Sequence, residues 1–236
     1  MIKSIIFDID NTLMDFMKMK RAAVDAAIDA MIDAGLSTPK EVMSKKIYDI
    51  YKEGIEQQDI FDKVLLQEFG AIDYRILAAG IVGYRRAKDG NMTLYPHVNM
   101  TLTQLNKRAI PMVVISDAPR LQAWLRIVSL GLQHYFEKII TFDDTNERKP
   151  SPKPFQFALD VLKTAPEETL MVGDWAERDI AGAKALGIRT AWAKYGNTFD
   201  TKDSGADYEL GDVYELVGII DRENSARPRQ ALERKS

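Results

Sequence analysis

The 236-residue sequence contains no cysteine. This absence excludes a disulfide framework, a thiolate metal site, an iron–sulfur cluster and a cysteine nucleophile. Histidine is nearly as scarce, because His97 and His134 are the only two, and two histidines exclude a multi-histidine metal site. A Ser-His-Asp triad would have to use one of them, and neither lies in a motif typical of such a triad. Any metal site or nucleophile must therefore rely mainly on side-chain oxygen atoms.

Long hydrophobic runs are also absent. The first apolar run ends at Asp8, short of the roughly 7–15 apolar residues of a secretory signal, and no uncharged apolar stretch approaches the roughly 18 residues that span a bilayer. With 32 basic and 35 acidic residues the net charge is −3, whereas a dedicated nucleic-acid binder is usually strongly basic. The lack of cysteine is compatible with a reducing compartment. We therefore expect a cytoplasmic monomer or homodimer with no nucleic-acid or membrane partner.

Short apolar runs alternate with longer helical patterns, which favours a parallel sheet with right-handed crossovers. Five runs are apolar enough to be strands buried on both faces, namely residues 3–9, 111–116, 138–142, 169–172 and 188–193. Helices are predicted between them over residues 97–107, 119–130, 152–163 and 177–186. The fold class expected from this alternation is α/β.

The segment from Asp15 to about Asn91 breaks the alternation, because it contains no convincing strand. An apolar stripe with helical spacing runs through Met17, Val24, Ile28 and Met31, and further helices are predicted over residues 39–57, 60–70 and 72–88. We therefore expect two domains, a core made of residues 1–14 and 92–236 and a helical insert over residues 15–91. This insert explains a length between one and two average domains of about 150 residues.

The first predicted strand ends in Asp8-Ile9-Asp10. Ligands of open parallel sheets bind beyond the carboxyl ends of the strands, so this is a place where chemistry is expected. Two carboxylates so close together repel each other unless a cation binds or one is protonated. For this motif alone, a helix cap beside an exposed aspartate is an equally good interpretation.

Three later segments carry a hydroxyl, a lysine and a second acid pair: Ser116-Asp117, Lys149 on a proline-rich loop, and Asp174 with Asp179. Taken singly, a helix cap explains Ser116-Asp117 better and a solvated lysine explains Lys149 better, and helix capping by Asp174 is the alternative for the last pair. Taken together, carboxylates without cysteine or clustered histidine suit Mg²⁺. A lysine and a hydroxyl beside such a metal suit a phosphoryl group. One aspartate could then form an aspartyl-phosphate while another protonates the leaving alcohol and later activates water.

The set Asp8-x-Asp10-Asn11-Thr12-Leu13, Ser116, Lys149-Pro150-x-Pro152 and Gly173-Asp174-x4-Asp179 resembles the four motifs of the haloacid dehalogenase superfamily, in order and with its spacing. The resemblance covers about residues 3–195. It implies a Rossmann-like, doubly wound parallel sheet with strand order 3-2-1-4-5. It also implies that the helical insert is a type C1 cap, which closes over the site and selects the substrate.

The resemblance implies a nucleophile and a magnesium site at the acidic positions. Asp8 would be the nucleophile and a Mg²⁺ ligand. Asp10 would be the general acid and base, and its backbone carbonyl would bind the metal. Asp174 would coordinate Mg²⁺, and Asp179 would lie behind it or bind through water.

The same resemblance implies phosphate binding by Ser116, helped by the amide of Asp117, and charge neutralisation by Lys149. Three features depart from the family pattern or compete with it. Asp117 stands where asparagine is common, so its side chain should point away from the phosphate or be held by another group. Arg148 stands where glycine is common. Lys153 competes for the role of Lys149, but the Lys-Pro-x-Pro context favours Lys149.

The presence of Asp10 favours phosphate esters over carbon–halogen bonds, because the dehalogenases that this chain resembles lack the second aspartate. The sequence thus predicts a Mg²⁺-dependent phosphatase that acts on a small phosphorylated metabolite, such as a sugar phosphate, a nucleotide or a similar phosphomonoester, through an aspartyl-phosphate. A sugar phosphomutase of the same fold remains open. A non-enzymatic phospho-acceptor resembling a receiver domain is the third alternative, although such domains are shorter and lack the insert.

Overall fold

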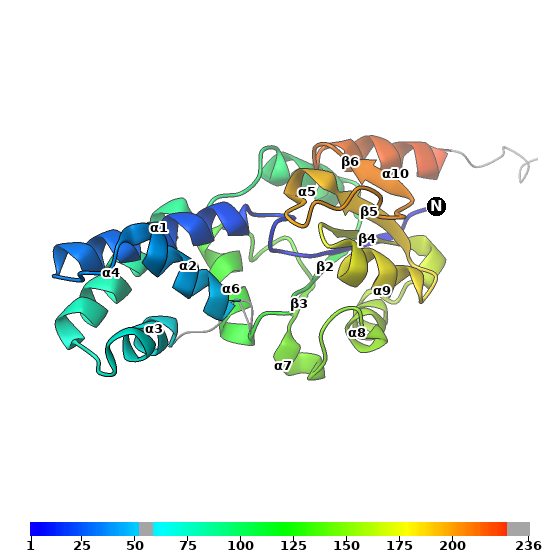
Figure 1. Cartoon of the computed structure of the whole chain (residues 1–236). Coiled ribbons are helices and arrows are strands. Elements are labelled where there is room, and N and C mark those ends of the chain that lie inside the picture. Colours follow the sequence, from blue (N-terminus) through cyan, green and yellow to red (C-terminus); the bar gives the residue numbers. More distant parts are fainter. Residues whose placement is uncertain (52–58, 226–236) are drawn as a thin grey trace, which may run out of the picture. The chain divides into compact units, whose positions relative to one another are not determined.

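The computed structural model describes residues 1–51 and 59–225, and the chain forms two compact units (Figure 1). One unit contains Met1–Asp15 and Leu94–Ser236, and the other contains Phe16–Thr93. These boundaries lie one to two residues beyond those expected from the sequence. The end of the helix predicted over residues 39–57 falls outside the described residues.

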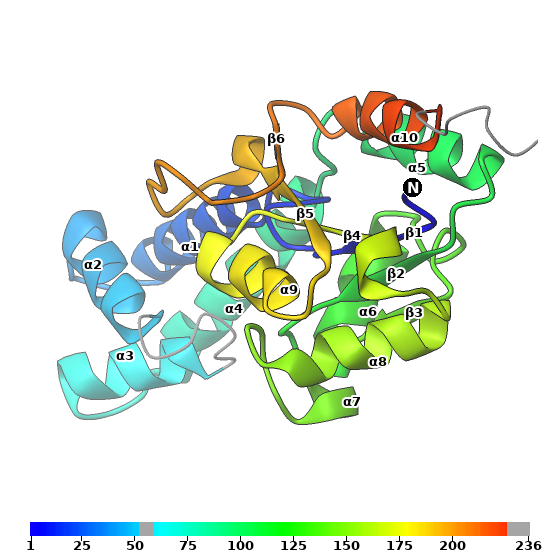
Figure 2. The ribbon, with the colours of Figure 1, turned by 90° about the vertical axis from the view of Figure 1, so that its right-hand side faces the viewer.

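A six-stranded sheet forms the centre of the first unit (Figure 2). Its strands are β1 (Ser4–Phe7), β2 (Met112–Ile115), β3 (Lys138–Ile140), β4 (Thr169–Gly173), β5 (Arg189–Ala193) and β6 (Tyr208–Leu210). Every neighbouring pair is parallel, and the order is 3-2-1-4-5-6. The α/β class and the doubly wound order are therefore confirmed. The sequence reading missed β6, because this short edge strand has only one buried residue and offers no apolar run.

The central strands explain why the sequence shows continuous apolar runs. Every residue of β1, β2 and β4 is buried, as expected when helices cover both faces of a parallel sheet. Phe7 pairs with Val114 on one side and with Val172 on the other. This register brings the carboxyl ends of β1, β2 and β4 out at the same edge of the sheet, one beside the next.

The helices of this unit are α5 (Val98–Lys107), α6 (Arg120–Ser129), α7 (Phe142–Thr145), α8 (Pro152–Leu162), α9 (Ala181–Lys184) and α10 (Glu215–Ser225). Both views place α5 and α10 on one side of the sheet and α8 and α9 on the other (Figures 1 and 2). Phe155 and Ala158 of α8 and Ala183 of α9 are buried in one cluster with strand residues such as Ile6. The short turns are η1 (Pro166–Glu168) and η3 (Lys194–Gly196).

One predicted helix differs in detail. The segment expected to be a helix over residues 177–186 begins as a π-turn, η2 (Ala176–Ile180), and continues as the single turn α9. The wider turn accompanies a contact within the same loop, in which the carboxylate of Asp179 accepts a hydrogen bond from the backbone N–H of Trp175. π-turns are frequent at functional sites.

The second unit has helices and connecting turns but no strand among its described residues, as the sequence predicts. It contains α1 (Phe16–Asp33), α2 (Lys40–Tyr51), α3 (Ile60–Phe69) and α4 (Tyr74–Asn91) around its own hydrophobic core. Two glycines let α4 approach α1 closely. A Cβ on Gly83 would lie 2.6 Å from the carbonyl oxygen of Ala26, and one on Gly80 would lie 2.2 Å from the Met31 methyl group.

The chain leaves the first unit and returns to it at neighbouring positions. The backbone N–H of Tyr95 donates to the carbonyl of Leu13 over 3.0 Å, and Met14 forms an antiparallel bridge with Leu94. Both contacts belong to the first unit. Among the described residues, no helix is long and apolar enough to cross a membrane.

Candidate active site

The loop after β1 makes a tight turn that carries both aspartates of the first motif. The backbone N–H groups of Leu13 and Met14 donate to the carbonyl of Ile9 over 2.9 and 3.2 Å, and Asn11 adopts a left-handed conformation with φ of 56°, which asparagine tolerates better than most residues. A Cβ on Gly196 would lie 1.7 Å from the carbonyl oxygen of Asn11. Only glycine therefore allows the backbone after β5 to pack so closely against this loop.

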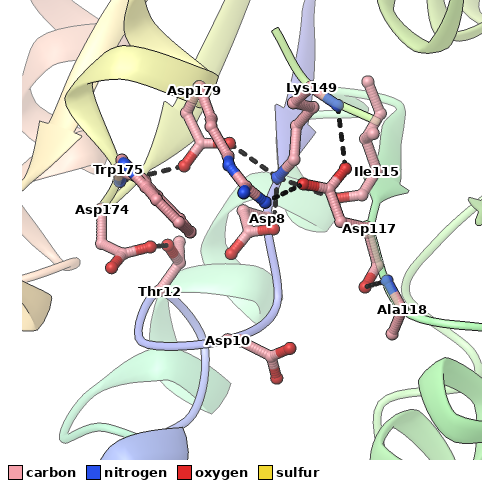
Figure 3. A network of polar contacts seen from close by, with 12 residues as sticks. Asp8, Asp10, Thr12, Ile115, Asp117, Ala118, Lys149, Asp174, Trp175 and Asp179 are labelled. Atoms are coloured by element: carbon pink, nitrogen blue, oxygen red, sulfur yellow. Dashed lines mark hydrogen bonds and ion pairs between the residues drawn. The ribbon is translucent and has the colours of Figure 1, made fainter. Parts of the chain in front are cut away.

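Lys149 meets two of the predicted aspartates. Its Nζ atom lies 2.5 Å from Asp8 Oδ1 and 2.6 Å from Asp179 Oδ1 (Figure 3). The lysine is buried, with 5% of its surface exposed, and buried charges are rare unless they are paired. Lys153 is exposed, and its Nζ atom lies 3.5 Å from Glu147 Oε1 instead. Of the two candidate lysines, the structure therefore brings Lys149 to the acidic cluster.

Asp174 completes a compact set of carboxylates with Asp8 and Asp179. One oxygen of each lies within 4.8 Å of the others, and all three residues are buried. Thr12 Oγ1 lies 3.5 Å from Asp174 Oδ1 as a weak donor, and the other oxygen, Oδ2, accepts no hydrogen bond from the described residues. A buried carboxylate oxygen without a hydrogen bond is costly unless a cation binds it. The donor set therefore fits Mg²⁺, which prefers hard oxygen ligands.

Glycine is required next to this set. A Cβ on Gly173 would lie 2.4 Å from the carboxylate carbon and one oxygen of Asp179. The backbone at the end of β4 can therefore lie against the carboxylate only because residue 173 has no side chain.

The electrostatics of the cluster favour a further positive charge. Burial, opposed by Lys149 and reinforced by Asp179, raises the pKa of Asp8 to about 8. Burial and repulsion from Asp8 raise the pKa of Asp174 to about 9. Burial alone would lower the pKa of Lys149, but the attraction of Asp179 and Asp8 raises it. One lysine does not balance three carboxylates, and a bound divalent cation would allow them to ionise together.

Ser116 and Asp117 follow β2 at the same edge of the sheet. Ser116 is buried, and its Oγ accepts a hydrogen bond from the backbone N–H of Ala118 over 3.2 Å. The side chain of Asp117 is held by two donors, Arg178 Nη1 at 3.0 Å and the backbone N–H of Lys149 at 2.9 Å. The expectation that another group holds Asp117 is therefore confirmed.

Arg178 was missed by sequence reasoning. It lies between the two aspartates of the last motif, and its guanidinium also lies 3.8 Å from the ring centroid of Trp175. Its position inside this motif was the only available signal, since its partner Asp117 is 61 residues away.

Asp10 lies apart from the carboxylate cluster. Figure 3 shows its side chain separated from those of Asp8, Asp174 and Asp179, and its Oδ2 lies 3.0 Å from Nη1 of the buried Arg126 in α6. Nothing in the predicted helix over residues 119–130 indicated that Arg126 would reach the first motif. The structure thus places two aspartates beside basic side chains at one sheet edge, Asp8 beside Lys149 and Asp10 beside Arg126.

The fold and this arrangement of carboxylates, lysine and serine define a hydrolase built on a Rossmann-like sheet. The profile of the haloacid dehalogenase-like hydrolase family matches residues 5–193. The chain belongs to this family, and the sequence prediction of a hydrolase is confirmed.

Two relatives that match nearly the whole chain are phosphatases by name. The chain is 32% identical over 229 residues to the glyceraldehyde 3-phosphate phosphatase of Pyrococcus furiosus, covering 95% of both chains. It is also 32% identical over 222 residues to the enzyme of the same name from Methanocaldococcus jannaschii, covering 93% of this chain and 97% of that protein. The crystal structure of a phosphatase of this family from Thermococcus onnurineus superposes with a TM-score of 0.67 at 26% identity, covering 93% of this chain and 98% of the other.

Proposed function

We propose that the protein is a Mg²⁺-dependent phosphatase that hydrolyses a small phosphorylated metabolite through an aspartyl-phosphate on Asp8. The observation that carries this proposal is the buried cluster of Asp8, Asp174 and Asp179 around Lys149. A carboxylate nucleophile needs a neighbouring cation when the phosphate, itself an anion, approaches.

The metal would be held by the carboxylates of Asp8 and Asp174 and by the backbone carbonyl of Asp10, with Asp179 bound directly or through water. When bound, Mg²⁺ would withdraw charge from the phosphoryl oxygens and let the carboxylates ionise together. Asp174 Oδ2 supports this assignment, because it is buried and accepts no hydrogen bond from the described residues.

In the first step an oxygen of Asp8 attacks phosphorus. The bond to the leaving oxygen breaks with its electron pair, and Asp10 gives that oxygen a proton. In the second step Asp10 takes a proton from water, whose oxygen attacks the phosphorus of the aspartyl-phosphate and releases inorganic phosphate. Lys149 and the Ser116 hydroxyl stabilise the charge on the phosphoryl oxygens during both transfers.

The substrate class we propose is a small sugar phosphate. It rests on two relatives, each named a glyceraldehyde 3-phosphate phosphatase and matching over more than nine tenths of this chain. The helical unit would act as the cap that selects the substrate. Location in the cytoplasm and a monomeric or homodimeric state remain predictions from the sequence.

The test is phosphate release from a panel of sugar phosphates, nucleotides and p-nitrophenyl phosphate, with Mg²⁺ or with EDTA. We expect release that depends on Mg²⁺, with glyceraldehyde 3-phosphate among the better substrates. The Asp8→Asn variant should fold and be inactive. Asp200→Asn, a matched change at an exposed aspartate, should keep wild-type activity.

Three outcomes would contradict the proposal. Full activity of Asp8→Asn would exclude the aspartyl-phosphate route. Formation of a phosphate isomer without net phosphate release would identify a phosphomutase. A long-lived aspartyl-phosphate without turnover would identify a phospho-acceptor.

A further inference from the structure

Helix α6 has an unusual distribution of side chains. It exposes four large apolar residues at helical spacing, Leu121, Trp124, Leu125 and Val128. On its buried face lie Ala123, Arg126 and Ile127. A surface helix normally buries its apolar stripe and exposes its charges. An arginine on the buried face is therefore a local exception, and such exceptions concentrate at functional positions.

Burying the charged guanidinium of Arg126 is unfavourable unless a partner lies beside it. Only 5% of its side chain is exposed, and a buried guanidinium requires a hydrogen-bonded or charged partner. Asp10 supplies one, since its Oδ2 lies 3.0 Å from Arg126 Nη1. The two residues are 116 positions apart in the sequence, so the pair exists only because α6 packs beside the loop after β1.

The pair of Asp10 and Arg126 lies apart from the acidic cluster, and this separation bears on what Asp10 can do. Asp8, Asp174 and Asp179 gather around one point, and Asp10 is not a member of that set. Only Ile9 separates Asp10 from Asp8 in the sequence, so without a second cation nearby its carboxylate could turn toward Lys149 or a bound metal. Arg126 provides that second cation, with its Nη1 atom 3.0 Å from Asp10 Oδ2.

We propose that Arg126 is a positioning residue that holds the Asp10 carboxyl group away from the metal-binding cluster and in place for proton transfer to the leaving oxygen. The inference rests on the proposed phosphatase function. Arg126 itself touches neither the reacting atoms nor the metal in this scheme. Its planar guanidinium fixes the orientation of a carboxylate more strictly than the single ammonium group of a lysine does.

The test uses the dependence of general acid catalysis on the leaving group. The p-nitrophenolate anion leaves without protonation, whereas the alkoxide of glycerol phosphate requires a proton as the bond breaks. The constant kcat/KM reports the steps up to formation of the aspartyl-phosphate. We expect Arg126→Met to lower kcat/KM for glycerol phosphate by about 10²–10³-fold and that for p-nitrophenyl phosphate by less than about tenfold, in line with the usual contribution of a general acid. Arg126→Lys should fall between the wild type and Arg126→Met.

Two controls separate positioning from a general structural role. Arg120→Met changes an exposed arginine at the start of the same helix, which pairs with Asp144, and should leave both rates unchanged. In an Asp10→Asn background, Arg126→Met should cause no further loss, because Arg126 acts through Asp10.

The outcomes are distinguishable. Equal losses on both substrates, no loss on either, or a full further loss in the Asp10→Asn background would overturn the inference. If Arg126→Met does not fold, Arg126→Lys carries the comparison, and its loss on glycerol phosphate must then exceed its loss on p-nitrophenyl phosphate by about threefold or more, a partial general-acid effect. A wild-type protein that releases phosphate from no member of the panel with Mg²⁺ would instead refute the proposed function.

Discussion

Replacing the proposed nucleophile should stabilise the protein in the absence of metal. The pKa of Asp8 is raised from 3.8 to about 8 in the folded chain, chiefly by burial. At pH 7 the unfolded chain has therefore released this proton while the folded chain still holds it. One pKa unit corresponds to 1.36 kcal/mol. The roughly three units between the unfolded pKa of 3.8 and pH 7 therefore mean that Asp8 lowers the free energy of unfolding by at most about 4 kcal/mol.

Because the side chain introduced by Asp8→Asn does not titrate, the variant does not have this destabilisation. The attraction of Lys149, 2.5 Å from Asp8, is already contained in this raised pKa. Because the amide of Asp8→Asn cannot reproduce every contact of the buried carboxyl group, we expect a net stabilisation of about 1–2 kcal/mol. For a chain of this size, this corresponds to a rise of roughly 2–8 °C in Tm.

The direction with pH follows from the raised pKa. The contribution of the Asp8 carboxyl group to stability is fully present below its unfolded pKa of 3.8 and is lost as the pH rises toward about 8. The Tm difference between Asp8→Asn and the wild type should therefore grow from near zero at about pH 4 to its largest value near pH 8, both measured with EDTA by circular dichroism. Adding Mg²⁺ should raise the Tm of the wild type more than that of the variant. A variant that melts at or below the wild-type temperature at pH 8 would refute this reasoning.

Two further substitutions test the loops around the cluster. Gly173→Ala places a methyl group 2.4 Å from the Asp179 carboxylate and should destabilise the protein by about 1–3 kcal/mol in denaturant unfolding. Gly90→Ala in α4, where a Cβ meets no atom within 4 Å, should be neutral or stabilising, and equal behaviour of the two variants would exclude the packing argument. Asp117→Asn removes a carboxylate at the sheet edge where we propose that phosphate binds, and it frees the charge of Arg178, so KM for a phosphate ester should fall several-fold at low salt. A rise in KM would show that the Asp117–Arg178 pair instead shapes the site.

The sequence predicted those parts of the fold and site that depend on local patterns. Residues of β1 such as Ile5 and Ile6 form an apolar run because they are buried on both faces, and the acids follow directly after the strands. The same local pattern was too short to indicate β6, of whose three residues only Leu210 is buried.

The positions that sequence analysis missed owe their role to contacts between distant segments. Arg126 meets Asp10 across 116 positions, and Gly196 meets Asn11 across 185. No spacing within either segment indicates such a contact, because it arises only when the sheet assembles and brings one strand end beside the next. A helix with an arginine among its apolar residues, or a glycine after a strand, is equally compatible with an ordinary surface.

The bridge between Met14 and Leu94 allows the helical unit to be exchanged for another inserted segment during evolution. Because the chain departs and returns at hydrogen-bonded neighbours, the ends of any segment inserted there are already held together by the first unit. The closure entropy of a loop grows only slowly with its length, by about 0.6 kcal/mol for each doubling. Recombination at these two codons could therefore exchange one insert for another of quite different size without rebuilding the sheet or its acidic edge. On the proposed role of the helical unit as a substrate-selecting cap, replacing this unit as a whole would change the substrate range and leave Asp8, Asp174 and Asp179 in place.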